Sequence, residues 1–320
     1  MSASGGSKAI IAAFLANVGI AIAKFAAWAI SGSSSMLAEG VHSLADSGNQ
    51  LLLLLGNKRA QQPADAAHPF GYGRVRYVYA FVVAIVLFSV GGVFSIYEGI
   101  AKIREPHMLE MWWLPLAVLV IAIVLESFSL RTAVRESRPL KGRRSWGRFI
   151  KESKAPELPV VLLEDFAALV GLTIAFFGVG LTVLTGNGLF DGIATVVIGV
   201  LLIVVAFVVG IEVKSLLVGE GASDEDVAKI EAALVDSKDV GRVIHMKTLY
   251  LSPDEFMVGA KIDVNPLATM SEVSVIVNLA ERRVRRAVPA AKVIYLEPDI
   301  YLDPNADTPS TSSIVMLSSD

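Results

Sequence analysis

Six long apolar segments, each almost free of charged residues, dominate this chain of 320 residues. Crossing the hydrocarbon core of a bilayer takes about 20 apolar residues in an α-helix, and each of the six segments reaches that length. The sequence therefore predicts a polytopic α-helical membrane protein with six transmembrane helices. Their predicted limits are Ala9–Ile30, Ser35–Asn57, Val75–Ala101, Trp112–Val134, Leu158–Leu184 and Leu189–Leu217.

The chain after the sixth segment has the composition of a small soluble domain. Ser223 precedes three acidic residues, and Thr269 and Glu272 have the spacing of a capping box, so each marks the start of a helix. The predicted strands are Val243–Leu251, Phe256–Val264 and Lys292–Leu296. This order is α-β-β-α-β. We expect three parts: a transmembrane domain over 1–218, a cytoplasmic α/β domain over 219–302 and a disordered tail over 303–320.

Lysine and arginine are distributed unequally between the connecting loops. The loop between the third and fourth segments has only Lys102 and Arg104. The loop after the fourth segment is strongly basic, with Arg131, Arg135, Arg138, Lys141, Arg143, Arg144, Arg148, Lys151 and Lys154. Such a loop could bind lipid or nucleic acid, but its position between two spans favours the positive-inside rule, which places both termini in the cytoplasm. We expect a lipid bilayer as the surroundings and no nucleic-acid partner. The N-terminal segment fits neither a cleavable signal peptide nor an organellar presequence, so we expect a bacterial inner membrane.

The second apolar segment carries polar residues along one helical face. These are Ser35, Glu39, His42, Asp46 and Asn49, at intervals of four, three, four and three. An ionisable side chain inside a membrane is costly unless it is paired or faces a wet cavity, so it indicates a functional site. The chain has no cysteine, which restricts a metal site to His, Asp, Glu or backbone oxygen. His42 and Asp46 lie one turn apart and can converge on one ion, and zinc accepts both ligand types. The alternative is a polar contact between helices, for which three ionisable residues would be expensive.

The fifth segment contains a second acidic feature, the adjacent pair Glu164 and Asp165 within an apolar run. Neighbouring side chains on a helix point about 100° apart. Both can therefore bind one ion only if the ion lies between their two directions. Otherwise one binds the ion, and the other orients a ligand, pairs with a cation or carries a proton.

Two motifs resemble those of the cation diffusion facilitator family. The run from Ser34 to Asp46, Ser-Ser-Met-Leu-Ala-Glu-Gly-Val-His-Ser-Leu-Ala-Asp, resembles the motif of that family's second helix. The run from His68 to Arg74, His-Pro-Phe-Gly-Tyr-Gly-Arg, is similar to the loop before its third helix. The resemblance covers nearly the whole chain. It implies a homodimer that exchanges cytoplasmic zinc, or a similar divalent ion, for protons by alternating access, with no prosthetic group.

The resemblance also implies a transport site made of two residue pairs. His42 and Asp46 match the pair on the second helix, and Asp165 matches the second acid of the pair on the fifth. The first member of that later pair falls at Val161, which cannot bind metal. The run Val-Leu-Leu-Glu-Asp resembles a branch of the family that includes a mitochondrial zinc exporter, where Glu164 is the substitute ligand. One histidine with up to three carboxylates also makes manganese, iron or cobalt plausible cargo.

Further positions are candidates for secondary roles. Asp65 and His68 match two positions of a cytoplasmic loop site, in which Tyr72 replaces the third; alternatively, His68 only begins the next helix and binds nothing. Glu39 lies one turn before His42 and either orients it or lies on the ion's route. The cytoplasmic domain is interpreted as a dimer contact.

Two other classes of function remain open from the residues. A membrane scaffold could bind metal without transporting it. A metal-dependent intramembrane hydrolase would also place metal ligands in a span, but the chain has no His-Glu-x-x-His motif, so we do not expect an enzyme.

Overall fold

The computed structural model describes residues 4–31, 34–106 and 113–301. The chain divides into two compact units. One runs up to Glu220 and includes Leu251–Asp254; the other begins at Gly221 and excludes those four residues. The predicted tail over 303–320 lies outside the described residues.

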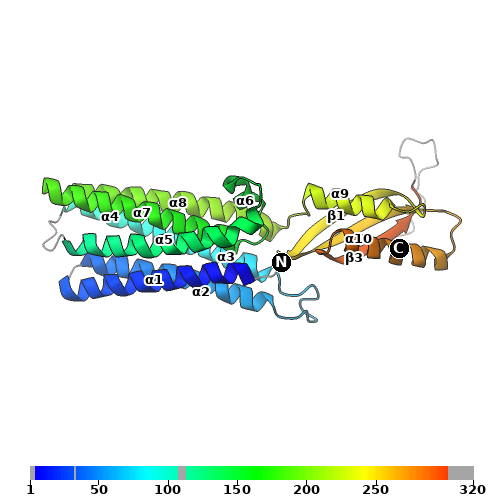
Figure 1. The fold of residues 1–320 in the computed structure, drawn as a ribbon, viewed down its shortest axis with the longest axis horizontal. Coiled ribbons are helices and arrows are strands. Elements are labelled where there is room, and N and C mark those ends of the chain that lie inside the picture. The colour runs from blue at the N-terminus through cyan, green and yellow to red at the C-terminus, as the bar shows by residue number, and fades with distance from the viewer. Residues whose placement is uncertain (1–3, 32–33, 107–112, 302–320) are drawn as a thin grey trace, which may run out of the picture. The chain divides into compact units, whose positions relative to one another are not determined.

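The first unit is a bundle of long helices that run side by side (Figure 1). Its elements are α1 (Ser4–Ser31), α2 (Ser34–Ala60), α3 (Val75–Val86), η1 (Leu87–Val93), α4 (Phe94–Arg104), α5 (Trp113–Lys141), α6 (Trp146–Glu152), α7 (Glu157–Thr185) and α8 (Leu189–Val218). Helix α1 packs on α2 and α5, α7 packs on α5 and α8, and α8 also packs on α4. The segments α3, η1 and α4 follow one another without a break, so the third predicted span is one helix with a π-helical turn at its middle.

Five helices of the described residues are long and apolar enough to cross a membrane. They are Lys8–Ile30, Val75–Arg104, Trp113–Lys141, Glu157–Thr185 and Leu189–Val218. The remaining predicted span, the second, is α2, a helix of 27 residues that packs against both α1 and α3. Its polar face lowers its mean hydropathy, but the helix belongs to the same bundle. The fourth span is longer than the sequence predicts and continues as helix from Val134 to Lys141.

The bundle exposes many large apolar side chains, and beside its apolar core it buries several ionisable ones. Large apolar side chains such as Leu15, Ile22 and Phe128 are more than 60% exposed, whereas Lys24 and Glu126 are at most 4% exposed. A soluble protein shows the opposite arrangement. An apolar outer surface suits contact with lipid, and ionisable residues buried inside a membrane bundle indicate a functional site.

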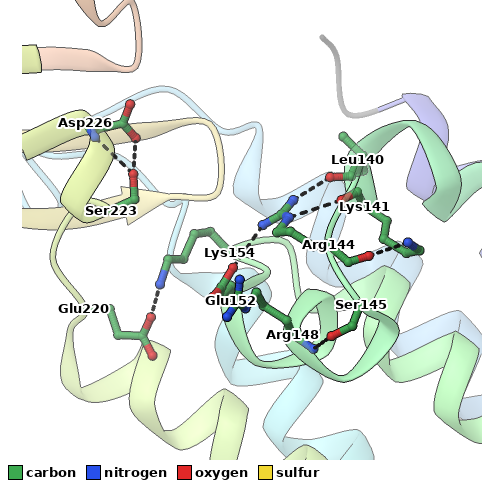
Figure 2. A network of polar contacts seen from close by, with 10 residues as sticks. All are labelled: Leu140, Lys141, Arg144, Ser145, Arg148, Glu152, Lys154, Glu220, Ser223 and Asp226. Atoms are coloured by element: carbon green, nitrogen blue, oxygen red, sulfur yellow. Dashed lines mark hydrogen bonds and ion pairs between the residues drawn. The ribbon is translucent and has the colours of Figure 1, made fainter.

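The basic segment after α5 contains a short helix that the sequence did not predict. Ser145 caps the start of helix α6, and its hydroxyl accepts a hydrogen bond from the Arg148 amide at 3.2 Å (Figure 2). The Glu152 carboxylate lies 3.6 Å from Arg144 Nη1 and 3.5 Å from Arg148 Nε. Lys154 forms an ion pair with Glu220. These contacts fold part of the basic segment into a compact cap at the ends of α5, α7 and α8.

The second unit has the predicted order α-β-β-α-β (Figure 1). Its elements are α9 (Asp224–Val235), β1 (Val240–Ser252), β2 (Glu255–Val264), α10 (Met270–Ala287) and β3 (Ala291–Asp299). The sheet order is β1-β2-β3, and β2 pairs with β3 in parallel. Ser223 caps α9, and Thr269 and Glu272 form the predicted capping box of α10. The core of this unit includes Ile230, Leu234, Phe256, Val258, Ile262 and Val284.

Candidate functional site

A cavity of about 90 Å³ lies among the helices of the bundle. Its lining includes four ionisable residues, Lys24 of α1, Asp46 of α2, Glu126 of α5 and Glu164 of α7. Asn17, Ser43, Ser95 and Thr195 add polar groups. Because a water molecule takes up about 30 Å³ in the liquid, the cavity has room for a partly hydrated ion. The two acids that the sequence predicts on the second and fifth spans, Asp46 and Glu164, thus face one space.

The Glu164 carboxylate is held by two amide side chains of α2. Asn49 Nδ2 donates to Glu164 Oε1 at 3.1 Å, and Gln50 Nε2 donates to Glu164 Oε2 at 2.9 Å. Glu164 is 5% exposed, and Gln50 is fully buried. Hydrogen bonds to a buried charged group are stronger than those between neutral groups, so these amides fix the carboxylate and stabilise it when ionised.

Asp165 points to a different neighbour. Ser129 Oγ of α5 donates to Asp165 Oδ2 at 2.6 Å, and Asp165 is 1% exposed. The Asp165 side chain also interacts directly with that of Glu126, which precedes Ser129 by one turn on the same helix. Glu164 is therefore turned toward α2 and Asp165 toward α5. The predicted divergence of these adjacent side chains is what the structure shows.

The acids form one electrostatic group. Glu126 is repelled by Asp165, Asp46 and Glu164, and both Glu164 and Asp165 are repelled by Asp46. Lys24 supplies an ammonium group, which donates to Ser43 Oγ at 2.9 Å. Four carboxyl groups and one ammonium group leave an excess of potential negative charge in a membrane interior. Such an excess is tolerated only when protons or cations compensate it.

Two predicted site residues lie where the structure describes the helix but not the side chain. His42 and Glu39 belong to α2, and their side chains are outside the described ones. Among the side chains that are described, no three of His, Asp or Glu surround a single point as metal ligands would. The described side chains around the cavity are therefore several acids and a lysine, and those alone do not form a closed coordination sphere.

Val161 occupies the position at which the resemblance expects a ligand. It is fully buried and belongs to the apolar core of the bundle together with Leu158 and Leu162. The departure at this position removes a polar group from α7 one turn before Asp165.

The loop between α2 and α3 brings Asp65, His68 and Tyr72 together. The Asp65 carboxylate accepts hydrogen bonds from the amides of Ala67 (2.9 Å) and His68 (2.7 Å) and from the Tyr72 hydroxyl (2.7 Å). The Tyr72 hydroxyl bond is the largest cause that lowers the pKa of Asp65 below its usual value. The His68 and Tyr72 rings lie 4.3 Å apart between centroids. These contacts give Asp65 a role in fixing the loop, whether or not an ion binds there.

From the sequence alone, Glu126 is interpreted only as one of several possible members of an internal charge pair, together with Glu98 and Lys24. Its signal was available: it is an ionisable residue inside a span, on the buried face of α5 that continues through Ser129, Ala133 and Ser137. What the sequence could not supply is that this face meets Asp165 of α7.

The family model of the cation efflux transmembrane domain matches residues 10–218, which contain the whole cavity. The chain belongs to the cation diffusion facilitator family. The resemblance drawn from the motifs of the second helix and the following loop is thereby confirmed.

Curated relatives extend this assignment. The mitochondrial proton-coupled zinc antiporter SLC30A9 of Homo sapiens is 33% identical over 263 residues, which cover 81% of this chain and 46% of the human protein. Metal tolerance protein C4 of Arabidopsis thaliana is 31% identical over 267 residues, covering 81% and 57%. The cation-efflux pump FieF of Pectobacterium atrosepticum is 25% identical over 292 residues, covering 90% and 89%. The chain spans about half the length of the first two relatives. All three have the names of transport or tolerance proteins and not of enzymes.

Proposed function

We propose that this cation diffusion facilitator exports a divalent metal cation, with zinc as the expected ion, in exchange for protons by alternating access. The observation that carries the proposal is the acid-lined cavity inside the membrane bundle. Carboxylates of α2 and α7 line it, so an ion in the cavity would be surrounded by the helices and separated from the lipid. The name of the human relative, a proton-coupled zinc antiporter, supports both the ion and the coupling.

The proposed ligands are His42, Asp46, Asp165 and Glu164. A metal binds imidazole in its neutral form and carboxylates in their ionised form, so binding releases protons from the same atoms. Competition between metal and proton at shared atoms is sufficient for exchange. Glu164 either completes the ligand set or relays a proton, and its hydrogen bonds from Asn49 and Gln50 suit both roles.

The donor set favours a second candidate within the same family. Oxygen ligands outnumber nitrogen ligands in the cavity, and carboxylate oxygens suit manganese better than zinc. Manganese, iron or cobalt is therefore the alternative cargo.

The organisation of the protein completes the proposal. We place the transmembrane domain over 1–218, the α/β domain and both termini on the cytoplasmic side of a bacterial inner membrane, and two copies of the chain in a dimer with contacts through the α/β domain. Glu39 would orient His42 or guide the ion, and Asp65 with His68 would form at most a secondary site in the loop. Because the chain has no cysteine, single cysteines introduced at Ser145 and Asn187 would report the side of each loop to an impermeant thiol reagent.

The decisive test is ion flux into proteoliposomes under an imposed pH gradient. Zinc, manganese, iron and cobalt are compared for the wild type, Asp165→Ala and the control Glu98→Gln. Glu98 is an acid of α4 that pairs with Lys102 at 3.7 Å and does not line the cavity. The proposal expects gradient-driven zinc uptake in the wild type and the control, and its loss in Asp165→Ala. Flux of another ion would reassign the cargo. Metal binding without flux of any ion would refute transport and favour a scaffold.

A further inference from the structure

We propose that Glu126 of α5 is a further ligand of the transported cation. It would replace the metal ligand that is missing at Val161 of α7. This inference rests on the proposed function. It adds a ligand from the fourth span to a site that the sequence assigns to the second and fifth spans alone.

The first support is the position of Glu126. Its side chain lines the same cavity as Asp46 and Glu164 and is 1% exposed. A carboxyl group buried in a membrane interior is costly unless a partner compensates it. Besides Glu126, the ionisable residues that line the cavity are Lys24, Asp46 and Glu164. The charges of Asp46, Glu164 and Asp165 act against that of Glu126.

The second support comes from individual oxygen atoms. Glu126 Oε2 and Asp165 Oδ1 are buried and receive no hydrogen bond from the described part of the chain. The other oxygen of Asp165, Oδ2, accepts the hydrogen bond from the Ser129 hydroxyl, so Oδ1 is left without this donor. The two carboxyl groups also contact each other directly, and such a contact between two acids is favourable only when a proton or a cation lies between them. A divalent cation with oxygen ligands fits this arrangement.

The third support is the contrast with Glu164. Each oxygen of Glu164 already accepts a hydrogen bond from an amide of α2, whereas Glu126 and Asp165 each keep one oxygen without a donor. Glu126, which lines the cavity, and Asp165, which lies beside it on α7 and is not part of the cavity lining, are therefore better prepared than Glu164 to accept an ion. The carboxyl groups do not yet surround one point, so binding must draw Asp46 toward this pair.

The test uses the absence of cysteine from the chain. A thiolate bound to Co²⁺ gives an intense near-ultraviolet charge-transfer band, which carboxylate and imidazole ligands do not give. Glu126→Cys places the only thiol of the protein at the proposed ligand position, and Glu98→Cys places it at an acid of α4 outside the cavity. The full-length variants in detergent are titrated with Co²⁺, and binding is followed independently through the visible spectrum of the bound ion.

The inference expects the charge-transfer band in Glu126→Cys and its absence in Glu98→Cys. If Glu126→Cys binds Co²⁺ but shows no such band, Glu126 is not a ligand, while the proposed function stands. If the wild type neither binds nor transports any of the four metals, the proposed function is wrong, and this inference, which rests on it, is wrong too.

A second variant covers the case in which Glu126→Cys does not fold. Glu126→Gln keeps the size of the side chain and removes its charge. In the flux assay we expect its apparent affinity for the transported metal to fall by about tenfold or more, as for the loss of groups that support a metal site. An affinity equal to that of the wild type would overturn the inference.

Discussion

The contact between the third and sixth spans allows a sharp test of the bundle. Gly92 of η1 and Gly99 of α4 lie seven residues apart, as do Gly192 and Gly199 of α8. A Cβ atom added at Gly199 would lie 2.9 Å from the Gly92 carbonyl oxygen, and one at Gly99 would lie 2.9 Å from the Gly192 carbonyl oxygen. The two helices therefore approach backbone to backbone, as small residues allow in membranes.

We predict that Gly199→Ala destabilises the protein relative to Gly210→Ala on the same helix. At Gly199 the new Cβ would meet Ile96 Cγ1 at 2.7 Å and the Ile96 backbone nitrogen at 2.9 Å, so a helix must shift. At Gly210 a Cβ meets nothing within 4 Å. Overpacking costs about 1–3 kcal/mol. The gain in helix propensity, up to about 1 kcal/mol, is common to both variants and cancels in the comparison.

The difference between the two variants should therefore be about 1–3 kcal/mol in favour of Gly210→Ala. For a domain of this size this corresponds to roughly 2–12 °C in the unfolding midpoint. The measurement is thermal unfolding of the full-length protein in detergent, followed by the fraction that remains monodisperse. Equal midpoints for the two variants would refute the close approach of α4 and α8.

Three further predictions concern hydrogen bonds. Asn49→Leu leaves Glu164 Oε1 without its donor and should lower stability by about 1.5–3 kcal/mol in the same unfolding assay, whereas Asn57→Leu, at a buried amide nitrogen of α2 without a partner among the described residues, should cost little or stabilise. Tyr72→Phe should raise the pKa of Asp65 toward its usual value. The loop contacts are lost as pH falls through the pKa of Asp65, so exchange protection of the Ala67 and His68 amides should disappear at a higher pH in the variant than in the wild type. An unchanged midpoint would contradict the role of the Tyr72 hydroxyl in lowering this pKa. Thr269→Ala removes the capping box of α10 and should destabilise that helix by about 1 kcal/mol, visible as faster amide exchange. The hydrogen bonds from Thr269 also lower the pKa of Glu272, so acidification through that lowered pKa should reduce the difference between the variant and the wild type.

Local periodicity was enough to predict most of the fold. The apolar runs located the spans, and capping signals at Ser223 and Thr269 located the helices of the α/β unit. The π-helical turn at Leu87–Val93 and the short helix at Trp146–Glu152 were not predicted. The first contains Ser89, Gly91 and Gly92, which allow an irregular helical turn but do not require a π-helix. The second lies in a basic segment. The positive-inside rule accounts for its lysines and arginines, so the charges gave no reason to predict a helix there.

The candidate site was predictable as far as one helix determines it. The face shared by His42 and Asp46 follows from helical spacing, and so does the divergence of Glu164 and Asp165. The partners of these acids depend on how helices pack, which a single sequence does not encode in any spacing. Asn49 and Gln50 are neighbours on α2, yet both reach Glu164, and Ser129 reaches Asp165 from a helix 36 residues earlier in the chain.

The hydrogen bonds around these acids also bear on transport itself. An exporter must release its ion, and during part of its cycle the ligand carboxylates need other partners, because an unsatisfied buried charge costs several kcal/mol. Asn49 and Gln50 provide such partners for Glu164, and Ser129 provides one for Asp165. A donor that holds a carboxylate more tightly makes its recruitment by the metal less favourable. The amide and hydroxyl groups of α2 and α5 would therefore set how readily the site gives up its cargo, although none of them needs to touch the ion.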